Sequence, residues 1–116
     1  MAIDAPLSIE RKDGSTPGTC IFILTGPLTL HNLFELQSQL RSCDSAKLSI
    51  LDLSGVPYMD SAGMGAIVNY YVFCQNRNVK LVIAGVSSRV MELFKMTRVD
   101  SVLTLAPTAE TAEASL

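Results

Sequence analysis

Short apolar runs alternate with segments of helical periodicity along this chain, and that alternation constrains the fold more than any other feature. Residues 20–24, 47–53 and 79–84 form continuous, β-rich apolar runs, which are typical of strands covered on both faces. Between them, residues 31–41 and 61–77 repeat apolar side chains at helical spacing. Strands that alternate with helices predict β-α-β crossovers, and therefore an α/β fold with a mixed, largely parallel sheet.

The remaining segments extend this pattern at both ends. Residues 7–11 alternate as an edge strand does, and residues 13–18 contain the turn formers of a hairpin. In the second half, Ser87 can cap a short helix, residues 102–105 predict the last strand, and Thr108 can cap a final helix that runs through residue 115. The predicted order therefore contains five strands and four helices.

Two details of the helices can also be predicted. Asn32 is a candidate cap for the helix at residues 31–41. In the longest helix, the apolar residues that share one stripe, and should face the sheet, are Met64, Ile67, Val68, Tyr71 and Cys74.

The composition excludes several classes of protein. The chain has 116 residues, which suits one compact domain over residues 1–116. Its net charge of −2 and the lack of a basic stripe argue against nucleic-acid binding, and no apolar run approaches the roughly 20 residues of a membrane span. Residues 1–7 lack a basic region, so we expect no secretory signal and a cytoplasmic protein. Cys20, Cys43 and Cys74 are widely spaced, which favours reduced thiols over a disulfide or a metal site.

The most informative motif lies at residues 57–65, directly after the strand at residues 47–53. This order predicts a strand, a short turn, and a helix whose first turn carries Ser61. A serine at such a position is exposed, and its oxygen lies near free backbone N–H groups, so Ser61 is well placed to carry a phosphate. The loops at residues 26–31 and 85–89 follow neighbouring strands and should gather at the same edge of the sheet.

Catalytic, metal and nucleotide sites find little support in these residues. A nucleophile elbow needs a glycine where Met59 stands, and nothing places the single histidine, His31, beside Ser61. Asp52 lies within a strand, where we expect it to anchor the loop rather than act as an acid or base. Val68 stands where a dinucleotide motif requires its third glycine, and no group of residues has metal-ligand spacing. We therefore predict no enzymatic activity, metal or cofactor.

Gly63 and Gly65 leave two explanations open. Glycine costs about 1 kcal/mol relative to alanine inside a helix, so two in one turn indicate that something approaches the backbone closely. Close packing on the sheet and a docking surface for another protein explain the pair equally well. Met59 and Met64 fit both explanations, because methionine adapts to irregular surfaces.

One loop of the chain resembles a known phosphorylation site. A similar loop occurs in the bacterial anti-sigma factor antagonists, which belong to the sulfate transporter and anti-sigma factor antagonist (STAS) domains, and here it reads Tyr58-Met59-Asp60-Ser61-Ala62-Gly63-Met64-Gly65. The resemblance covers roughly residues 7–105, including the strand before the loop and the helix after it. It implies a single STAS-like domain with a four- or five-stranded mixed sheet packed against helices.

The resemblance also implies a function by partner switching. The unphosphorylated protein binds an anti-sigma factor, which is often also a serine kinase, and so frees a sigma factor. Ser61 matches the serine that the kinase phosphorylates with ATP and magnesium, and a separate phosphatase resets the protein. The residues expected to contact the partner are Tyr58, Met59, Asp60, Ser61, Ala62, Gly63, Met64, Thr29 and Ser87.

One residue departs from the family pattern, and other functions remain open. Many members carry G-x-L-D after the second strand, whereas this chain reads Gly26-Pro27-Leu28-Thr29. Thr29 removes a negative charge near the phosphorylation loop, which bears on recognition by a kinase. The alternative function is a constitutive subunit of a larger assembly, such as a phospholipid-trafficking ABC transporter or a stress-sensing complex. A monomer suits a protein that exchanges partners, with a dimer as the alternative.

Overall fold

The computed structural model shows a mixed sheet with helices on both faces, and it describes residues 7–41 and 46–114. Its elements follow the predicted order: β1 (Ser8–Asp13), β2 (Thr19–Thr25), α1 (Leu33–Leu40), β3 (Leu48–Gly55), α2 (Ser61–Asn76), β4 (Lys80–Ala84), α3 (Ser88–Met96), β5 (Thr104–Ala106) and α4 (Ala109–Ala114). Short 3₁₀ turns precede α1 (η1, Leu30–Asn32) and follow α3 (η2, Val99–Ser101).

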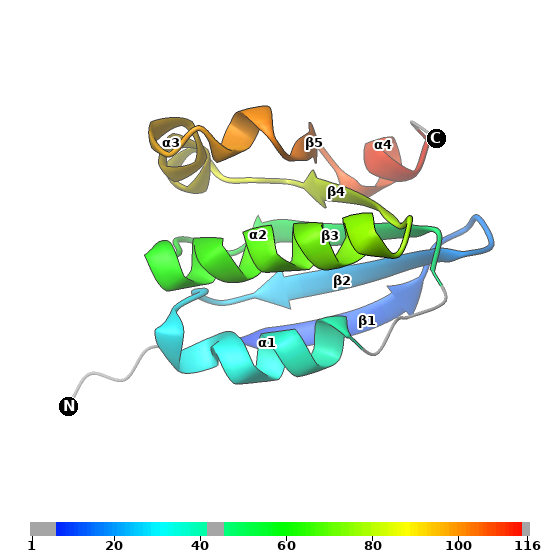
Figure 1. Cartoon of the computed structure of the whole chain (residues 1–116), viewed down its shortest axis with the longest axis horizontal. Coiled ribbons are helices and arrows are strands. Elements are labelled where there is room, and N and C mark those ends of the chain that lie inside the picture. Colours follow the sequence, from blue (N-terminus) through cyan, green and yellow to red (C-terminus); the bar gives the residue numbers. More distant parts are fainter. Residues whose placement is uncertain (1–6, 42–45, 115–116) are drawn as a thin grey trace.

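The strands lie in the order β1-β2-β3-β4-β5 within one sheet (Figure 1). β1 is antiparallel to β2, and every other neighbouring pair is parallel. The predicted α/β fold with a mixed, largely parallel sheet is therefore confirmed. Because β2, β3 and β4 run in the same direction, the loops after them lie at one edge of the sheet, where α1 and α2 begin (left in Figure 1).

Helices cover the two faces of the sheet unequally. The larger core lies between the sheet and α1, α2 and α3, and it includes Phe22, Leu51 and Phe94, which have no exposed surface. On the other face α4 packs through Ala112 against residues such as Ile50. Successive residues of the central strands thus point into two different cores, which is why their sequences are continuously apolar.

The structure confirms two predicted helix caps and corrects a third. Ser87 and Thr108 accept backbone N–H groups of α3 and α4 at 3.3 and 3.1 Å. Asn32 makes no capping hydrogen bond, because the η1 turn begins before it and its backbone is already in the right-handed helical region. Its side chain instead donates to the carbonyl oxygen of Pro27 at 2.7 Å.

The buried face of α2 is rotated relative to the predicted stripe. The residues of α2 that are buried are Gly63, Ala66, Ile67, Tyr70 and Cys74, whereas Met64, Val68 and Tyr71 of the predicted stripe are partly exposed. The prediction gave no weight to the small residues or to Tyr70, whose hydroxyl shares a buried hydrogen bond of 2.7 Å with Ser49 of β3. A small side chain and a satisfied polar group can occupy a core-facing position that hydrophobicity does not reveal.

The last strand was predicted at residues 102–105, and this prediction is wrong for residues 102 and 103. Val102 is 50% exposed, and β5 begins at Thr104. α3 ends at Met96, and Arg98, two residues farther along, adopts a left-handed conformation with φ of 62° before the η2 turn reverses the chain. Only Leu103 turns inward before β5 pairs with β4. The predicted end of the final helix, residue 115, lies outside the described residues.

Cys20 and Cys74 are buried thiols outside any disulfide, as predicted, and Cys43 lies outside the described residues. Over residues 7–41 and 46–114, no helix has the length and apolar character that crossing a bilayer requires.

Candidate functional site

Two loops that are distant in sequence pair at the edge where β2 and β3 end. Leu28, after β2, forms a parallel bridge with Met59, after β3. The Leu28 N–H donates to the carbonyl oxygen of Tyr58 at 3.1 Å, and the Asp60 N–H donates to the carbonyl oxygen of Leu28 at 3.2 Å. Thr29 and Asp60 therefore lie one residue beyond the same bridge, as the gathering of loops at this edge predicts.

Asp60 connects this bridge to the start of α2. Its Oδ1 accepts the N–H of Gly63 at 2.8 Å, which makes Asp60 the N-cap of α2. Its Oδ2 accepts the N–H of Leu30 in η1 at 3.1 Å. A carboxylate is favoured at a helix N-terminus by the helix dipole. One side chain thus joins the first turn of α2 to the turn that leads into α1.

Ser61 is the first residue of α2 and is exposed, as predicted. One of the N–H groups expected near its oxygen, that of Gly63, is already bonded to Asp60. The N–H groups of Ser61 and Ala62 also lie in the first turn, where the helix itself provides no acceptor. The site therefore presents a serine hydroxyl to solvent at a helix start whose capping position is occupied by a carboxylate.

The surroundings of Ser61 contain no catalytic arrangement within the described residues. No hydrogen bond joins Ser61 to a base there, and His31 is an exposed residue of η1. Asp52 anchors the end of β3, as predicted, by accepting the N–H and the hydroxyl of Ser54 at 3.0 and 2.7 Å. In this part of the chain, no group of three histidine, cysteine or acidic side chains could hold a metal ion.

The two glycines of the motif have different explanations. A Cβ atom at Gly63 would collide with the carbonyl oxygen of Leu28, so this glycine is required by close packing within the molecule. A Cβ atom at Gly65 would meet nothing within 4 Å. Close packing therefore explains Gly63, although against the loop at Leu28 rather than on the sheet as predicted, while the docking explanation for Gly65 stays a prediction.

The structure divides the residues predicted to bind a partner into three groups. Asp60 and Ser61 are exposed; Tyr58, Ala62, Met64 and Ser87 are partly exposed; Met59, Gly63 and Thr29 are buried. The buried three can shape this surface through their backbone and packing, but their side chains do not form it.

Thr29 lies inside the paired loops rather than on the surface. It is 6% exposed, and its Oγ1 has no hydrogen-bond partner within the described residues. A buried hydroxyl without a partner costs about 1–3 kcal/mol. An aspartate at this position would put a second carboxylate near Asp60, so Thr29 reduces the negative charge beneath the loop.

Three exposed apolar side chains on the elements around α2 were not predicted from the sequence. Leu30 is 64% exposed, Phe34 is 88% exposed and Met96 is 81% exposed. The N–H of Leu30 donates to Asp60. Met96 precedes Thr97, whose hydroxyl donates to the sulfur of Met64 in α2 at 3.2 Å. The sequence feature that could have revealed this surface was Phe34, an apolar residue that lies outside the apolar stripe of α1. We call Leu30, Phe34 and Met96 the apolar flanks.

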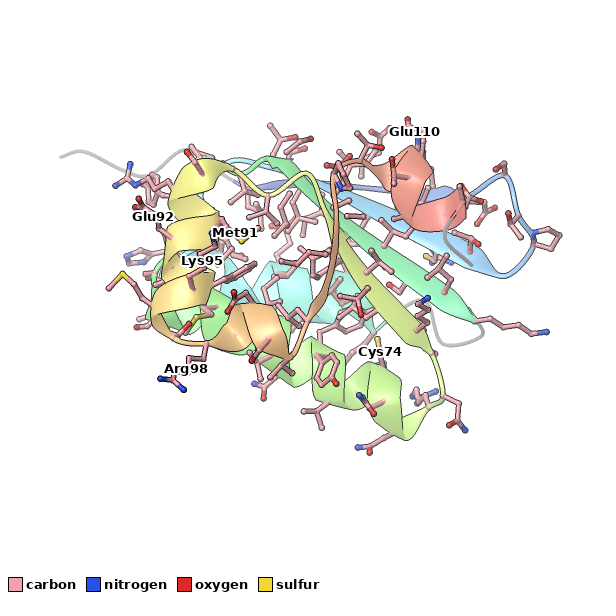
Figure 2. The ribbon with its side chains drawn as sticks, turned by 90° about the horizontal axis from the view of Figure 1, so that it is seen from above. Cys74, Met91, Glu92, Lys95, Arg98 and Glu110 are labelled. Atoms are coloured by element: carbon pink, nitrogen blue, oxygen red, sulfur yellow. The ribbon has the colours of Figure 1, made fainter. Side chains whose placement is uncertain are left out.

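A basic residue of α3 also reaches the loop and was missed by the sequence analysis. The guanidinium carbon of Arg89 lies 5.2 Å from the centre of the Tyr58 ring. Farther along α3, the charged residues Glu92 and Lys95 and, just beyond the helix, Arg98 are exposed (Figure 2). The surface around Ser61 therefore combines one carboxylate, one stacked guanidinium and the apolar flanks.

Comparisons with known proteins agree with this architecture. The model of the STAS domain matches residues 11–112. The anti-sigma-B factor antagonist of Listeria monocytogenes is 29% identical over 99 residues, which are 84% of this chain and 86% of that protein. Solute carrier family 26 member 10 of Mus musculus is 28% identical over 109 residues, but the match spans 16% of that protein. The crystal structure of an anti-sigma factor antagonist from Mycobacterium paratuberculosis has a TM-score of 0.84 at 18% identity, with 97% of each chain covered.

Proposed function

The chain belongs to the STAS domain family, and we propose that within this family it acts as an anti-sigma factor antagonist. In its unphosphorylated form it binds an anti-sigma factor that is also a serine kinase, and this binding frees a sigma factor. Phosphorylation of Ser61 ends the binding. The similarity to the Listeria antagonist, over 84% of this chain, supports a regulatory role rather than an enzymatic one.

The main support for the proposal is that Ser61 is exposed at a helix start that hydrogen bonds fix in place. Asp60 bonds both α2 and η1, so the serine is presented in one geometry. A kinase needs such an accessible hydroxyl, and a partner protein gains affinity when the surface it binds is already ordered. The apolar flanks on the elements around α2 are exposed side chains of the kind that dominate binding energy once a partner buries them.

Phosphorylation would act on the interface through charge. The γ-phosphoryl group of ATP is transferred to the Ser61 oxygen, the bond to ADP breaks, and the hydroxyl proton is lost. The phosphate adds about −1.5 to −2 charges at neutral pH. Buried unpaired against a partner, such a group costs at least several kcal/mol, and each 1.4 kcal/mol or so weakens binding about tenfold.

The same charge should leave the fold almost unchanged. The helix N-terminus favours a phosphate by roughly 0.3–1 kcal/mol, and the neighbouring Asp60 opposes it by a similar amount at the surface. We expect the melting temperature of the phosphorylated protein to stay within a few degrees of the unmodified one. A decrease of about ten degrees or more in a circular dichroism melt would contradict a switch by charge alone.

The partners of the protein and its place in the cell form part of the same proposal. The protein works in the cytoplasm as a monomer and exchanges between an anti-sigma factor and a phosphatase that removes the phosphate. It requires no nucleic acid, metal or cofactor. With Thr29 in place of an aspartate, the kinase must recognise a loop with one fewer negative charge than many relatives have.

Intact mass is the first test of the switch. Protein purified from its native cells should carry one phosphate, and the Ser61→Ala variant should carry none. Ser88→Ala is a matched control, because Ser88 is also an exposed first residue of a helix that follows a parallel strand. A phosphate that persists in Ser61→Ala, or that disappears in Ser88→Ala, would show that the modified residue is a different one.

Affinity for the anti-sigma factor tests the apolar flanks. Phe34→Ala should weaken binding by about tenfold or more, because truncating an exposed aromatic anchor removes a central contact of the interface. Val72→Ala is the control, since Val72 is a half-exposed apolar residue of α2 outside the flanks. Equal affinities of Phe34→Ala and the unchanged protein would remove α1 from the proposed interface.

A second candidate function is a constitutive subunit of a larger assembly. The match to a transport protein of which the chain spans only 16% supports it, because STAS domains also occur as parts of such proteins. Unmodified Ser61 under both growth and stress conditions, together with co-purification of a transporter ATPase, would favour this function. A neighbouring gene for a kinase-like anti-sigma factor would favour the first.

A further inference from the structure

Arg89 contacts the loop before Ser61, and the proposed switch gives it no role. It is exposed in the first turn of α3, and its guanidinium lies over the ring of Tyr58 at 5.2 Å. Within residues 7–41 and 46–114, no carboxylate forms an ion pair with it. A guanidinium stacked on a partly exposed ring is held weakly and can leave for a stronger partner.

The ring that holds Arg89 is close to Ser61 along a constrained loop. The carbonyl oxygen of Tyr58 accepts the N–H of Leu28, so the start of this loop is tied to its neighbour. Ser61 lies three positions after Tyr58, which limits their Cα atoms to about 11 Å apart. Both side chains extend from the same short segment at the start of α2.

A phosphate on Ser61 would lack a cation within its own loop. Asp60 is the adjacent side chain, carries a negative charge, and already occupies the N–H of Gly63. An arginine is the best available partner for a phosphate, since its planar guanidinium can donate two parallel hydrogen bonds to the phosphate oxygens. Arg89 is placed on the next helix to supply that partner.

We propose that Arg89 is the internal receptor of the phosphate on Ser61: on phosphorylation its guanidinium leaves the Tyr58 ring and binds the phosphate. This inference rests on the proposed phosphorylation of Ser61. Phosphorylation then changes the surface in two ways, because it adds a charge and it also withdraws a cation from the Tyr58 ring. The ring then loses this cation at the place where the partner is proposed to bind.

The second pKa of the phosphate tests this contact directly. The full chain is produced with phosphoserine encoded at position 61, so that no natural kinase is needed, and the phosphate is titrated by ³¹P NMR. A nearby guanidinium stabilises the dianion, so Arg89→Gln should raise this pKa by about 0.5 unit or more. Arg98→Gln, which removes another exposed arginine just beyond the end of α3, should shift it by about 0.1 unit or less. Asp60 and Glu92, the acidic groups nearest in sequence on α2 and α3, are unchanged in both variants.

An unchanged pKa in Arg89→Gln, or equal shifts in the two variants, overturns the proposal. The ring resonances of Tyr58 provide a second measurement: they should move on phosphorylation of the unchanged protein and stay nearly still in Arg89→Gln. Circular dichroism confirms that each variant is folded. These results are independent of the mass analysis in native cells, where a missing phosphate would contradict the proposed function but not the contact between Arg89 and the phosphate.

Discussion

The starts of α2 and α3 follow the same local plan, but only one of them is joined to the rest of the site. Each helix follows a parallel strand, has a capping side chain, and begins with an exposed serine. Ser87 accepts one N–H, from its own helix, at 3.3 Å. Asp60 accepts one from its own helix at 2.8 Å and a second from Leu30 in another loop. A capping signal in a sequence therefore does not reveal whether the helix start is also a tertiary junction.

Among the changes considered, a substitution at the third residue after the α2 cap should lower the stability of the protein most. In α2 this residue is Gly63, and Gly63→Ala would force a methyl group against the carbonyl oxygen of Leu28. We expect a loss of about 2–3 kcal/mol in the free energy of unfolding, measured by urea denaturation, because overpacking against backbone cannot relax easily.

Gly65→Ala is the control for that experiment. The added methyl group meets no neighbour, so alanine's better helix propensity should stabilise the protein by up to about 1 kcal/mol. If both alanine variants were destabilised equally, glycine flexibility in α2 rather than the contact with Leu28 would explain the motif.

Removing the caps is expected to have the next largest effect. Asp60→Ala loses a cap and a link between loops, which should cost about 2 kcal/mol, whereas Ser87→Ala loses a local cap only and should cost about 0.5–1 kcal/mol. Hydrogen exchange of the Leu30 amide distinguishes the two caps: it should accelerate in Asp60→Ala and stay unchanged in Ser87→Ala. Equal exchange rates would mean that the bond to Leu30 contributes nothing to the order of η1.

The two helices also end alike, and here the expected effects are smaller. Asn78 follows α2 and Arg98 follows α3, both with φ near +60° (59° and 62°). Glycine adopts this conformation without strain, and asparagine tolerates it better than arginine does. Arg98→Gly should therefore stabilise the protein by about 0.5–1 kcal/mol, and Asn78→Gly by a few tenths, in thermal melts. A larger gain at Asn78 would contradict this reasoning.

A pH titration probes a second long-range carboxylate contact, at α4. The Thr16 N–H donates to Glu113 at 2.6 Å, and this hydrogen bond lowers the pKa of Glu113 from its ordinary value of 4.5. The ionised form is thus favoured in the folded state, so its stabilisation is present above about pH 4.5 and is lost as the pH falls below it. Glu113→Gln should be slightly less stable than the unchanged protein at pH 7, and this difference should shrink as the pH falls below about 4.5. A stability difference that does not vary with pH would exclude this contact as the cause.

The predictions from sequence succeeded where the signal was local. The apolar runs correctly indicated strands covered on both faces, and Ser87 and Thr108 were correctly assigned as caps because capping involves only neighbouring residues. The assignment of Asn32 failed because the 3₁₀ turn before it was not apparent in the sequence. The rotated face of α2 was missed because Gly63 and Tyr70 face the core for reasons of shape and hydrogen bonding that hydrophobicity does not express.

By itself, the sequence determined the order of the elements, the mixed and largely parallel sheet, and the presence of an exposed serine at the start of α2. These follow from periodicity and from chemistry between residues that are close in the chain. Only the tertiary structure decided that Asp60 joins the start of α2 to η1, that Thr29 is buried, and that Arg89 lies over Tyr58. These contacts depend on how loops from different strands are brought together, and that register arises from the packing of the whole sheet rather than from any one segment.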